Sequence, residues 1–134
     1  MSEEVKGVLV GHGRMAEGLL DAIAGITGSH EGLTAIDNVG LTPQSLEERI
    51  HELIGSQQAV VFVDLPSGSC AHAARRLQAR RSDLAVVCGV NLPLLLDFIF
   101  HRELPLEQVV ERLRSRVGVS IEYSADADSS LSGR

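Results

Sequence analysis

The sequence predicts an α/β protein built on an open, doubly wound sheet of mainly parallel strands. Short apolar runs that favour strands alternate with longer segments whose apolar residues recur at helical spacing. The strand-like runs are apolar on both faces, as expected of strands that lie between two layers of helices. Alternating strands and helices give parallel strands joined by right-handed crossovers.

Four strand-like runs and the helices between them account for the first two thirds of the chain. The strands are expected over Gly7–Val10, Leu33–Asp37, Ala59–Asp64 and Leu84–Gly89. The first helix is expected over Met15–Thr27, and its apolar stripe consists of Met15, Leu19, Ile23 and Ile26. The second helix has Thr42 as its N-cap and Pro43 as its first residue, and Gly55 ends it.

The second half of the chain adds three helices and one more strand. The third helix extends from about Gly68 to Arg80, with small residues that allow close packing on the sheet. A fourth helix starts near Pro93 and a fifth at Pro105. A last short strand is expected over Val119–Tyr123. Residues 124–134 are rich in Ser, Asp and Gly and are expected to be a disordered tail.

Composition and charge narrow the classes of function. The 134 residues suffice for one domain, expected over residues 1–123. The formal net charge of −6 argues against nucleic acid or an anionic membrane as the main partner. The two cysteines, Cys70 and Cys88, favour reduced thiols in the cytoplasm over a disulfide framework. The chain begins with acidic residues where a signal peptide needs basic ones, and we expect no membrane-spanning segment.

Chemistry-bearing residues follow three of the expected strands. The segment Gly11–Gly13, with His12 at its centre, follows the first strand, and Asp64 ends the third. Residues 65–69 come directly after Asp64, and Asn91 follows the fourth strand. Ligands of an open α/β sheet bind beyond the carboxyl ends of its strands, so we expect these loops to converge on one crevice.

A histidine at such a strand-to-helix turn can accept a phosphoryl group. Asp64 would accept a hydrogen bond from one ring nitrogen of His12 and leave the lone pair of the other nitrogen facing outward. The N–H groups that open a helix suit phosphate oxygens, and glycines let the backbone approach them closely. The predicted phosphate-binding residues are Gly13, Ser67, Gly68 and Ser69. Arg14 is an additional candidate cation.

Structural alternatives exist for each of these residues. His12 can be an ordinary turn residue, and Asp64 or the two serines after it can cap the third helix. The glycine pair around His12 suggests a dinucleotide site with Asp37 as its ribose ligand, but Gly18 comes one turn too late for that fingerprint. Cys70 is interpreted as a small helix residue rather than a nucleophile.

No metal or other cofactor is expected. The remaining histidines are His30, His51, His72 and His101. No pair among them has the spacing of metal ligands, so all four are expected to be solvated.

Three segments, taken together in this order and spacing, resemble the IIA domain of the mannose family of the bacterial sugar phosphotransferase system. They are Gly-Val-Leu-Val-Gly-His-Gly at residues 7–13, Val-Phe-Val-Asp-Leu-Pro-Ser-Gly-Ser at 61–69 and Gly-Val-Asn-Leu-Pro at 89–93. The resemblance extends from about Lys6 to Tyr123. A related phosphocarrier of dihydroxyacetone kinase has a similar fold, but the third segment favours the mannose family.

The resemblance implies a phosphotransferase that works as a phosphohistidine carrier in sugar transport. His12 matches the family's phosphorylated histidine, Asp64 matches the aspartate that orients it, and Ser69 matches the serine of its glycine-rich turn. The phosphoryl group would come from the phosphocarrier HPr and pass to a histidine of a IIB domain. The membrane would be reached only indirectly, through IIC and IID proteins.

The resemblance also implies a flavodoxin-like, three-layer fold with an antiparallel edge strand at its C-terminal end. Members of the family are often homodimers, and the strand expected over Val119–Tyr123 would be exchanged between the subunits. An alternative function is a stand-alone regulatory module whose phosphorylation state is read by a partner. A flavin- or nucleotide-binding domain is disfavoured by an aromatic content of only 3%.

Overall fold

The computed structural model describes residues 4–118 and 120–124. Four parallel strands form one sheet in the order β2-β1-β3-β4. The strands are β1 (Lys6–Gly11), β2 (Leu33–Asp37), β3 (Ala59–Val63) and β4 (Leu84–Cys88). The helices are α1 (Met15–Thr27), α2 (Pro43–Ile54), α3 (Ser69–Ala79), α4 (Leu92–Ile99) and α5 (Leu106–Ser115).

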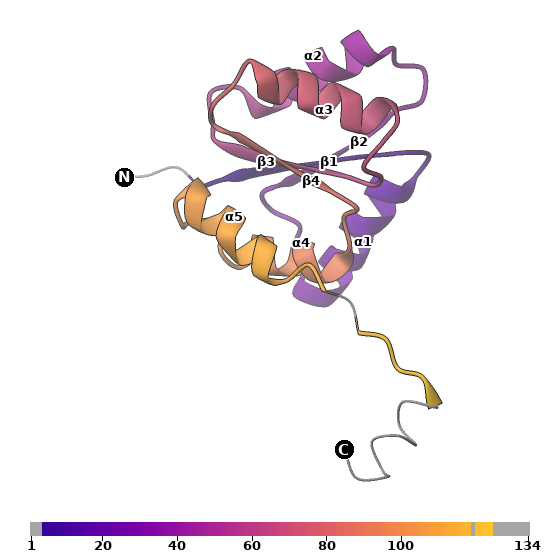
Figure 1. Ribbon diagram of the computed structural model, residues 1–134, viewed down its shortest axis with the longest axis vertical. Coiled ribbons are helices and arrows are strands. Elements are labelled where there is room, and N and C mark those ends of the chain that lie inside the picture. The colour runs from indigo at the N-terminus through magenta and orange to yellow at the C-terminus, as the bar shows by residue number, and fades with distance from the viewer. Residues whose placement is uncertain (1–3, 119, 125–134) are drawn as a thin grey trace.

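Two layers of helices enclose the sheet, as the alternation of strands and helices predicts. Helices α2 and α3 cover one face, and α1, α4 and α5 cover the other (Figure 1). Alternate residues of each strand enter opposite cores: Val8 packs under α2 and α3, and Leu9 packs on the other side. The second core also holds Phe62 and Phe98, whose rings meet edge to face with centroids 5.1 Å apart. The predicted doubly wound α/β class is therefore confirmed.

The ends of the elements lie close to their predicted positions. The hydroxyl oxygen of Thr42 accepts a hydrogen bond from the Ser45 N–H, and Pro43 opens α2, so both helix-start signals are confirmed. Strand β3 ends at Val63, one residue earlier than predicted. Asp64 therefore belongs to the loop beyond the strand, where its side chain can face the neighbouring loop.

The predicted apolar stripe of α1 is partly wrong. Ile23 is fully buried, but Met15 and Ile26 are 40% and 60% exposed, and Ala16 is buried instead. Met15 is the first residue of the helix and Ile26 the last but one. The buried face of α1 is therefore centred on the side of Ala16 and Ile23, and Met15 and Ile26 lie at its exposed margin.

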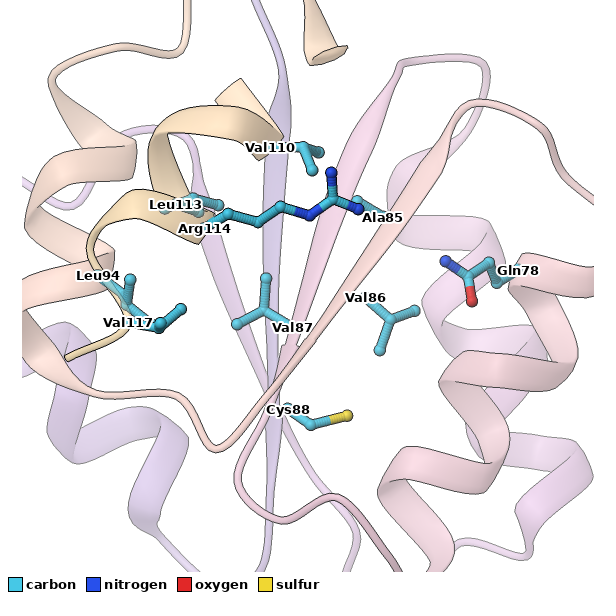
Figure 2. Close-up of a pocket in the computed structure, with 10 residues that line it drawn as sticks. All are labelled: Gln78, Ala85, Val86, Val87, Cys88, Leu94, Val110, Leu113, Arg114 and Val117. Atoms are coloured by element: carbon cyan, nitrogen blue, oxygen red, sulfur yellow. The ribbon is translucent and has the colours of Figure 1, made fainter. Parts of the chain in front are cut away.

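Among the residues that the structure describes, no strand pairs with the outer edge of β4. This edge borders a groove of about 300 Å³ between α3 and α5, lined among others by Val86, Val87, Val110 and Leu113 (Figure 2). Residues 120–123 pair with no strand of this sheet, and position 119 lies outside the described residues. The predicted antiparallel edge strand therefore stays a prediction.

The expected tail at residues 125–134 also lies outside the described residues. Within the part of the chain that the structure describes, no helix is both long and apolar enough to cross a membrane.

Candidate functional site

The candidate site lies at the point where the strand order of the sheet reverses. From the central strand β1 the chain leads to β2 on one side, and β3 lies on the other side. Such a switch point leaves a crevice beyond the carboxyl ends of the two central strands. His12 follows β1 and Asp64 follows β3, so the topology brings the two predicted residues together.

The imidazole of His12 is held by the carboxylate of Asp64. Nδ1 of His12 lies 2.7 Å from Oδ2 of Asp64, and the same oxygen accepts the backbone N–H of His12 at 2.9 Å. Oδ1 of Asp64 accepts the N–H of Leu65 at 2.9 Å. The side chain of Asp64 is only 8% exposed, whereas that of His12 is 46% exposed. A buried, rigid acceptor thus orients an accessible imidazole.

The carboxylate of Asp64 is ionised in this arrangement. Burial by itself raises the pKa of Asp64, but the hydrogen bonds from the side chain and backbone of His12 outweigh burial and hold the pKa below its ordinary value. An ionised carboxylate only accepts hydrogen bonds, so Nδ1 of His12 carries the proton and Nε2 presents a lone pair. The alternative role of Asp64 as a cap of α3 is wrong, because Gly68 is the N-cap of that helix.

The predicted phosphate-binding residues lie in the two loops that carry His12 and Asp64. Gly68 has φ 96° and ψ −176°, a conformation open to glycine, and a Cβ at this position would lie 4.0 Å from Nε2 of His12. Ser69 is the first residue of α3 and is half-buried. Ser67 is exposed in the same loop, and Gly13 takes φ 57° just after His12.

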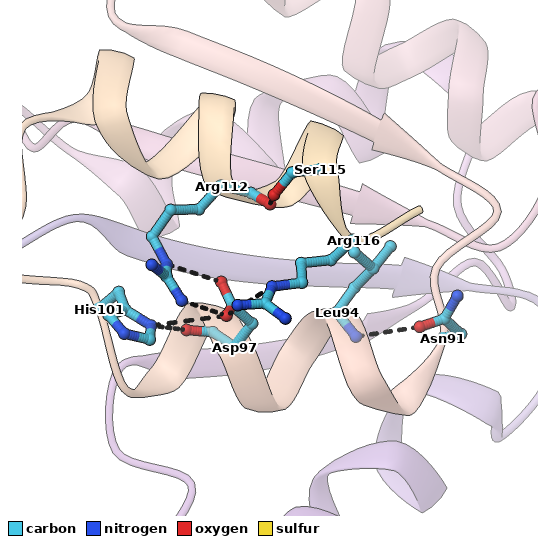
Figure 3. A network of polar contacts seen from close by, with 7 residues as sticks. All are labelled: Asn91, Leu94, Asp97, His101, Arg112, Ser115 and Arg116. Carbon is cyan, nitrogen blue, oxygen red and sulfur yellow. Dashed lines mark hydrogen bonds and ion pairs between the residues drawn. The ribbon is translucent and has the colours of Figure 1, made fainter. Parts of the chain in front are cut away.

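Three other polar residues at this edge make local contacts instead. The side chain of Arg14 is 89% exposed and pairs with Glu17, so it is held by the surface of α1. Asp37 accepts the N–H of Val39 in a turn of its own. Oδ1 of Asn91 accepts the N–H of Leu94 at 3.0 Å and caps α4 (Figure 3).

Two residues join the site that sequence reasoning missed. Nδ2 of Asn38, in the loop after β2, donates a hydrogen bond to Oγ of Ser69 at 3.4 Å. Nη1 of Arg75, on α3, donates to the carbonyl oxygen of Pro66 at 2.8 Å and so supports the loop after β3. Asn38 directly follows β2, the strand next to β1, and this position could have predicted its place at the site. No feature of the sequence could have predicted the contact of Arg75.

Two of the remaining histidines are not simply solvated, contrary to expectation. His51 is half-buried, with Nδ1 3.4 Å from a guanidinium nitrogen of Arg81. Nδ1 of His101 lies 2.7 Å from the carbonyl oxygen of Asp97. The carboxylate of Asp97 receives two hydrogen bonds from Arg112, at 2.8 and 3.2 Å, and this network ties α4 to α5 (Figure 3). The contact of His101 arises because it lies four residues after Asp97. The other contacts arise where neighbouring elements pack together.

Cys70 lies directly behind the His12–Asp64 pair. It is fully buried in the first turn of α3. Burial raises the pKa of its thiol, and the nearby charge of Asp64 raises it further, so Cys70 is not an activated nucleophile. A nitrogen of His12, a carboxylate oxygen of Asp64 and Sγ of Cys70 all lie within 4.8 Å of one another. These three side chains can together supply ligands for a metal ion.

Comparisons with known proteins identify the family of the chain. A family model described as "PTS system fructose IIA component" matches residues 6–113. The chain is 30% identical to the fructose-specific EIIA component of Bacillus subtilis over 114 residues, which cover 81% of this chain and 78% of that protein. It is 26% identical to the sorbose-specific EIIA component of Klebsiella pneumoniae over 98 residues, which cover 71% and 73% of the two chains.

A solved structure shows the same fold. The phosphotransferase system component EIIA from Streptococcus agalactiae superposes with a TM-score of 0.80 at 22% identity, covering 90% of this chain and 98% of that one. Family match, curated relatives and fold agree: the chain belongs to the mannose-type IIA family of the bacterial sugar phosphotransferase system.

Proposed function

We propose that this protein carries a phosphoryl group on Nε2 of His12, accepting it from phosphorylated HPr and passing it to a histidine of a IIB protein. The observation that carries the proposal is the 2.7 Å contact between Nδ1 of His12 and Oδ2 of Asp64. This contact fixes the tautomer and leaves the nucleophilic lone pair on Nε2. It resembles the way that an aspartate orients the histidine in other histidine-dependent enzymes.

The transfer is a displacement at phosphorus. The lone pair of Nε2 forms the new bond to phosphorus while the bond from phosphorus to HPr breaks, and that electron pair leaves with HPr. The proton on Nδ1 stays between His12 and Asp64, whose negative charge offsets the positive charge that develops on the imidazole. Backbone N–H groups at the start of α3, with the hydroxyl of Ser69, would donate hydrogen bonds to the phosphoryl oxygens.

Intact mass of the protein after incubation with phosphoenolpyruvate, enzyme I and HPr tests this function. The wild-type chain should gain the mass of one phosphoryl group and lose it again when a IIB protein is added. His12→Ala should gain none and keep its fold, because a half-exposed loop residue contributes little core burial. His72→Ala, which removes an exposed histidine of α3, is the matched control and should be phosphorylated like wild type. Phosphorylation of His12→Ala would overturn the assignment.

We also propose that the protein is a homodimer in which residues 119–123 of each chain pair with β4 of the other. Within residues 4–118 and 120–124 no strand pairs with the outer edge of β4, and such edges are covered in stable proteins. The groove beside this edge is lined by apolar side chains of β4 and α5. In the last described segment, Ile121 and Tyr123 are 80% and 65% exposed, although both residue types favour strands.

Light scattering on the full chain tests the dimer. The full chain should have the mass of two subunits at micromolar concentration, and a monomer would refute strand exchange. Removal of all residues after Gly118 should give monomers or insoluble protein, because β4 is then left uncovered. Removal of residues 125–134 alone is the control and should leave the dimer unchanged.

A further inference from the structure

The cluster behind the phosphorylation site has an unusual mixture of side chains. His12 comes from the end of β1, Asp64 from the end of β3 and Cys70 from the first turn of α3, and their ligand atoms lie within 4.8 Å of one another. Phosphoryl transfer as described above uses His12 and Asp64 but has no role for the sulfur of Cys70. We propose that this cluster is also a binding site for a divalent transition-metal ion such as zinc, and that the bound ion blocks phosphorylation of His12.

The donor set fits zinc. An imidazole nitrogen, a carboxylate oxygen and a thiolate sulfur bind this ion at roughly 2.0–2.3 Å, and two such ligands of a tetrahedral ion lie roughly 3.3–3.7 Å apart. The ligand atoms of the cluster lie at most 4.8 Å apart, so shifts of up to about 1 Å bring them to these spacings. His12 can supply such a shift because it lies in a loop and is 46% exposed. Solvent on the exposed side of His12 provides the fourth ligand as water.

Charge also favours a divalent ion at this place. The carboxylate of Asp64 and the thiolate form of Cys70 together carry two negative charges, which a divalent ion neutralises in a largely buried site. Binding releases the thiol proton to solvent, as metal binding to cysteine requires. The three ligands are spread over residues 12–70 of the sequence, so no local spacing motif indicates the site.

A metal ion on either ring nitrogen removes the nucleophile. If Nδ1 of His12 binds the ion, the proton of the neutral ring moves to Nε2, which then has no free lone pair. If Nε2 binds the ion, that lone pair is used directly. Competition with phosphorylation is therefore a consequence of imidazole chemistry, and this part of the inference rests on the proposed function of His12.

Cobalt(II) titration of the full chain tests binding without any phosphotransfer partner. Cobalt bound to a cysteine gives a charge-transfer band in the near ultraviolet, and zinc should abolish the band by displacement. Cys70→Ser should lose the band and weaken binding by more than the roughly 10- to 100-fold that loss of an outer-sphere partner costs. Cys88→Ser is the matched control: this second thiol lies at the end of β4, 3.5 Å from Nη2 of Arg75, and the variant should bind like wild type.

His12→Ala provides a second route to the same result, because it removes a ligand from an exposed loop rather than from the core. It too should weaken cobalt binding. Absence of the band in wild type, or equal affinity in wild type and Cys70→Ser, would overturn the metal site.

Transfer from purified phosphorylated HPr, with zinc and with a chelator, tests the competition. The ratio of the two rates should be low for wild type and Cys88→Ser and close to one for Cys70→Ser. A cobalt band together with equal rates in zinc and chelator would refute the block. Failure of wild type to become phosphorylated in chelator would refute the proposed function, whereas the cobalt spectra would still decide whether the metal site exists.

Discussion

Asp64→Asn is the substitution that tests the role of the carboxylate most directly. Its two oxygens accept three N–H groups: Oδ2 accepts Nδ1–H and the backbone N–H of His12, and Oδ1 accepts the N–H of Leu65. Asparagine has one acceptor oxygen. Its NH₂ group must therefore face either the two donors of His12 or the donor of Leu65, and in both cases the negative charge beside the imidazole is lost.

The size of the effect follows from these bonds. Hydrogen bonds to a charged group contribute about 1.5–3 kcal/mol each, so the two bonds to His12 amount to about 3–6 kcal/mol. At about 1.4 kcal/mol for each factor of ten, this range corresponds to a slowing of roughly 10²- to 10⁴-fold. The upper end equals the loss of about 10⁴-fold when the aspartate of a serine protease triad is replaced by asparagine.

The assay is the single-turnover rate of transfer from phosphorylated HPr, followed by intact mass. Asp37→Asn is the matched control, because this carboxylate ends the neighbouring strand β2 and accepts the Val39 N–H within its own turn. The control should transfer at the wild-type rate, and both variants should melt cooperatively. Wild-type rates in Asp64→Asn would refute the reasoning and would reduce Asp64 to a structural residue of the loop.

Two further substitutions separate local strain and charge from catalysis. Gly68→Ala should cost about 1–3 kcal/mol of stability because the residue has a positive φ. It should also slow transfer, because the added Cβ would lie 3.8 Å from the ring of His12. Gly28→Ala is the control: it also has a positive φ but has open space around it, so it should lose stability and keep the wild-type rate of transfer. Glu47→Gln should cost about 1 kcal/mol at neutral pH. The hydrogen bond from Arg76 does most to hold the pKa of Glu47 below its ordinary 4.5, against the opposing effect of burial. A lowered pKa stabilises the fold above pH 4.5, and this contribution is lost as the pH falls through the pKa of the folded protein. Urea unfolding across acid pH should therefore show a flatter decline in the variant, and identical pH profiles would contradict this role.

The strands and helices could be predicted because their signals are local. The apolar runs predicted the four strands, and Thr42 followed by Pro43 predicted the residue at which α2 begins. The stripe of α1 failed at Met15 and Ile26, because the buried face of the helix is centred closer to Ala16 and Ile23 than the spacing of the large apolar residues indicates. The proposed pairing of residues 120–123 with a second chain depends on contacts between subunits, which no local sequence signal reports.

The site was predictable only as far as topology determines it. His12 and Asp64 follow adjacent central strands, and parallel strands bring such residues to one edge. Two other contacts could not be predicted, because they depend on the directions of side chains from separate elements. They are the hydrogen bond from Arg75 to the loop after β3 and the hydrogen bond from Asn38 to Ser69. The same holds for Cys70, which the sequence suggested was a small helix residue and whose Sγ lies within 4.8 Å of ligand atoms of His12 and Asp64.

The shape of the site favours a protein over a small molecule as the donor of the phosphoryl group. Small-molecule sites are concave and enclose most of their ligand. Here the groove of about 300 Å³ lies along β4 and is lined by neither His12 nor Asp64. His12, the proposed nucleophile, is instead 46% exposed beyond the end of β1, and the carboxylate of Asp64 beside it is buried. The proposed carrier role requires this combination: the imidazole would have to reach a phosphoryl group still bonded to another protein, while Asp64 would hold the tautomer fixed before and after the partner docks.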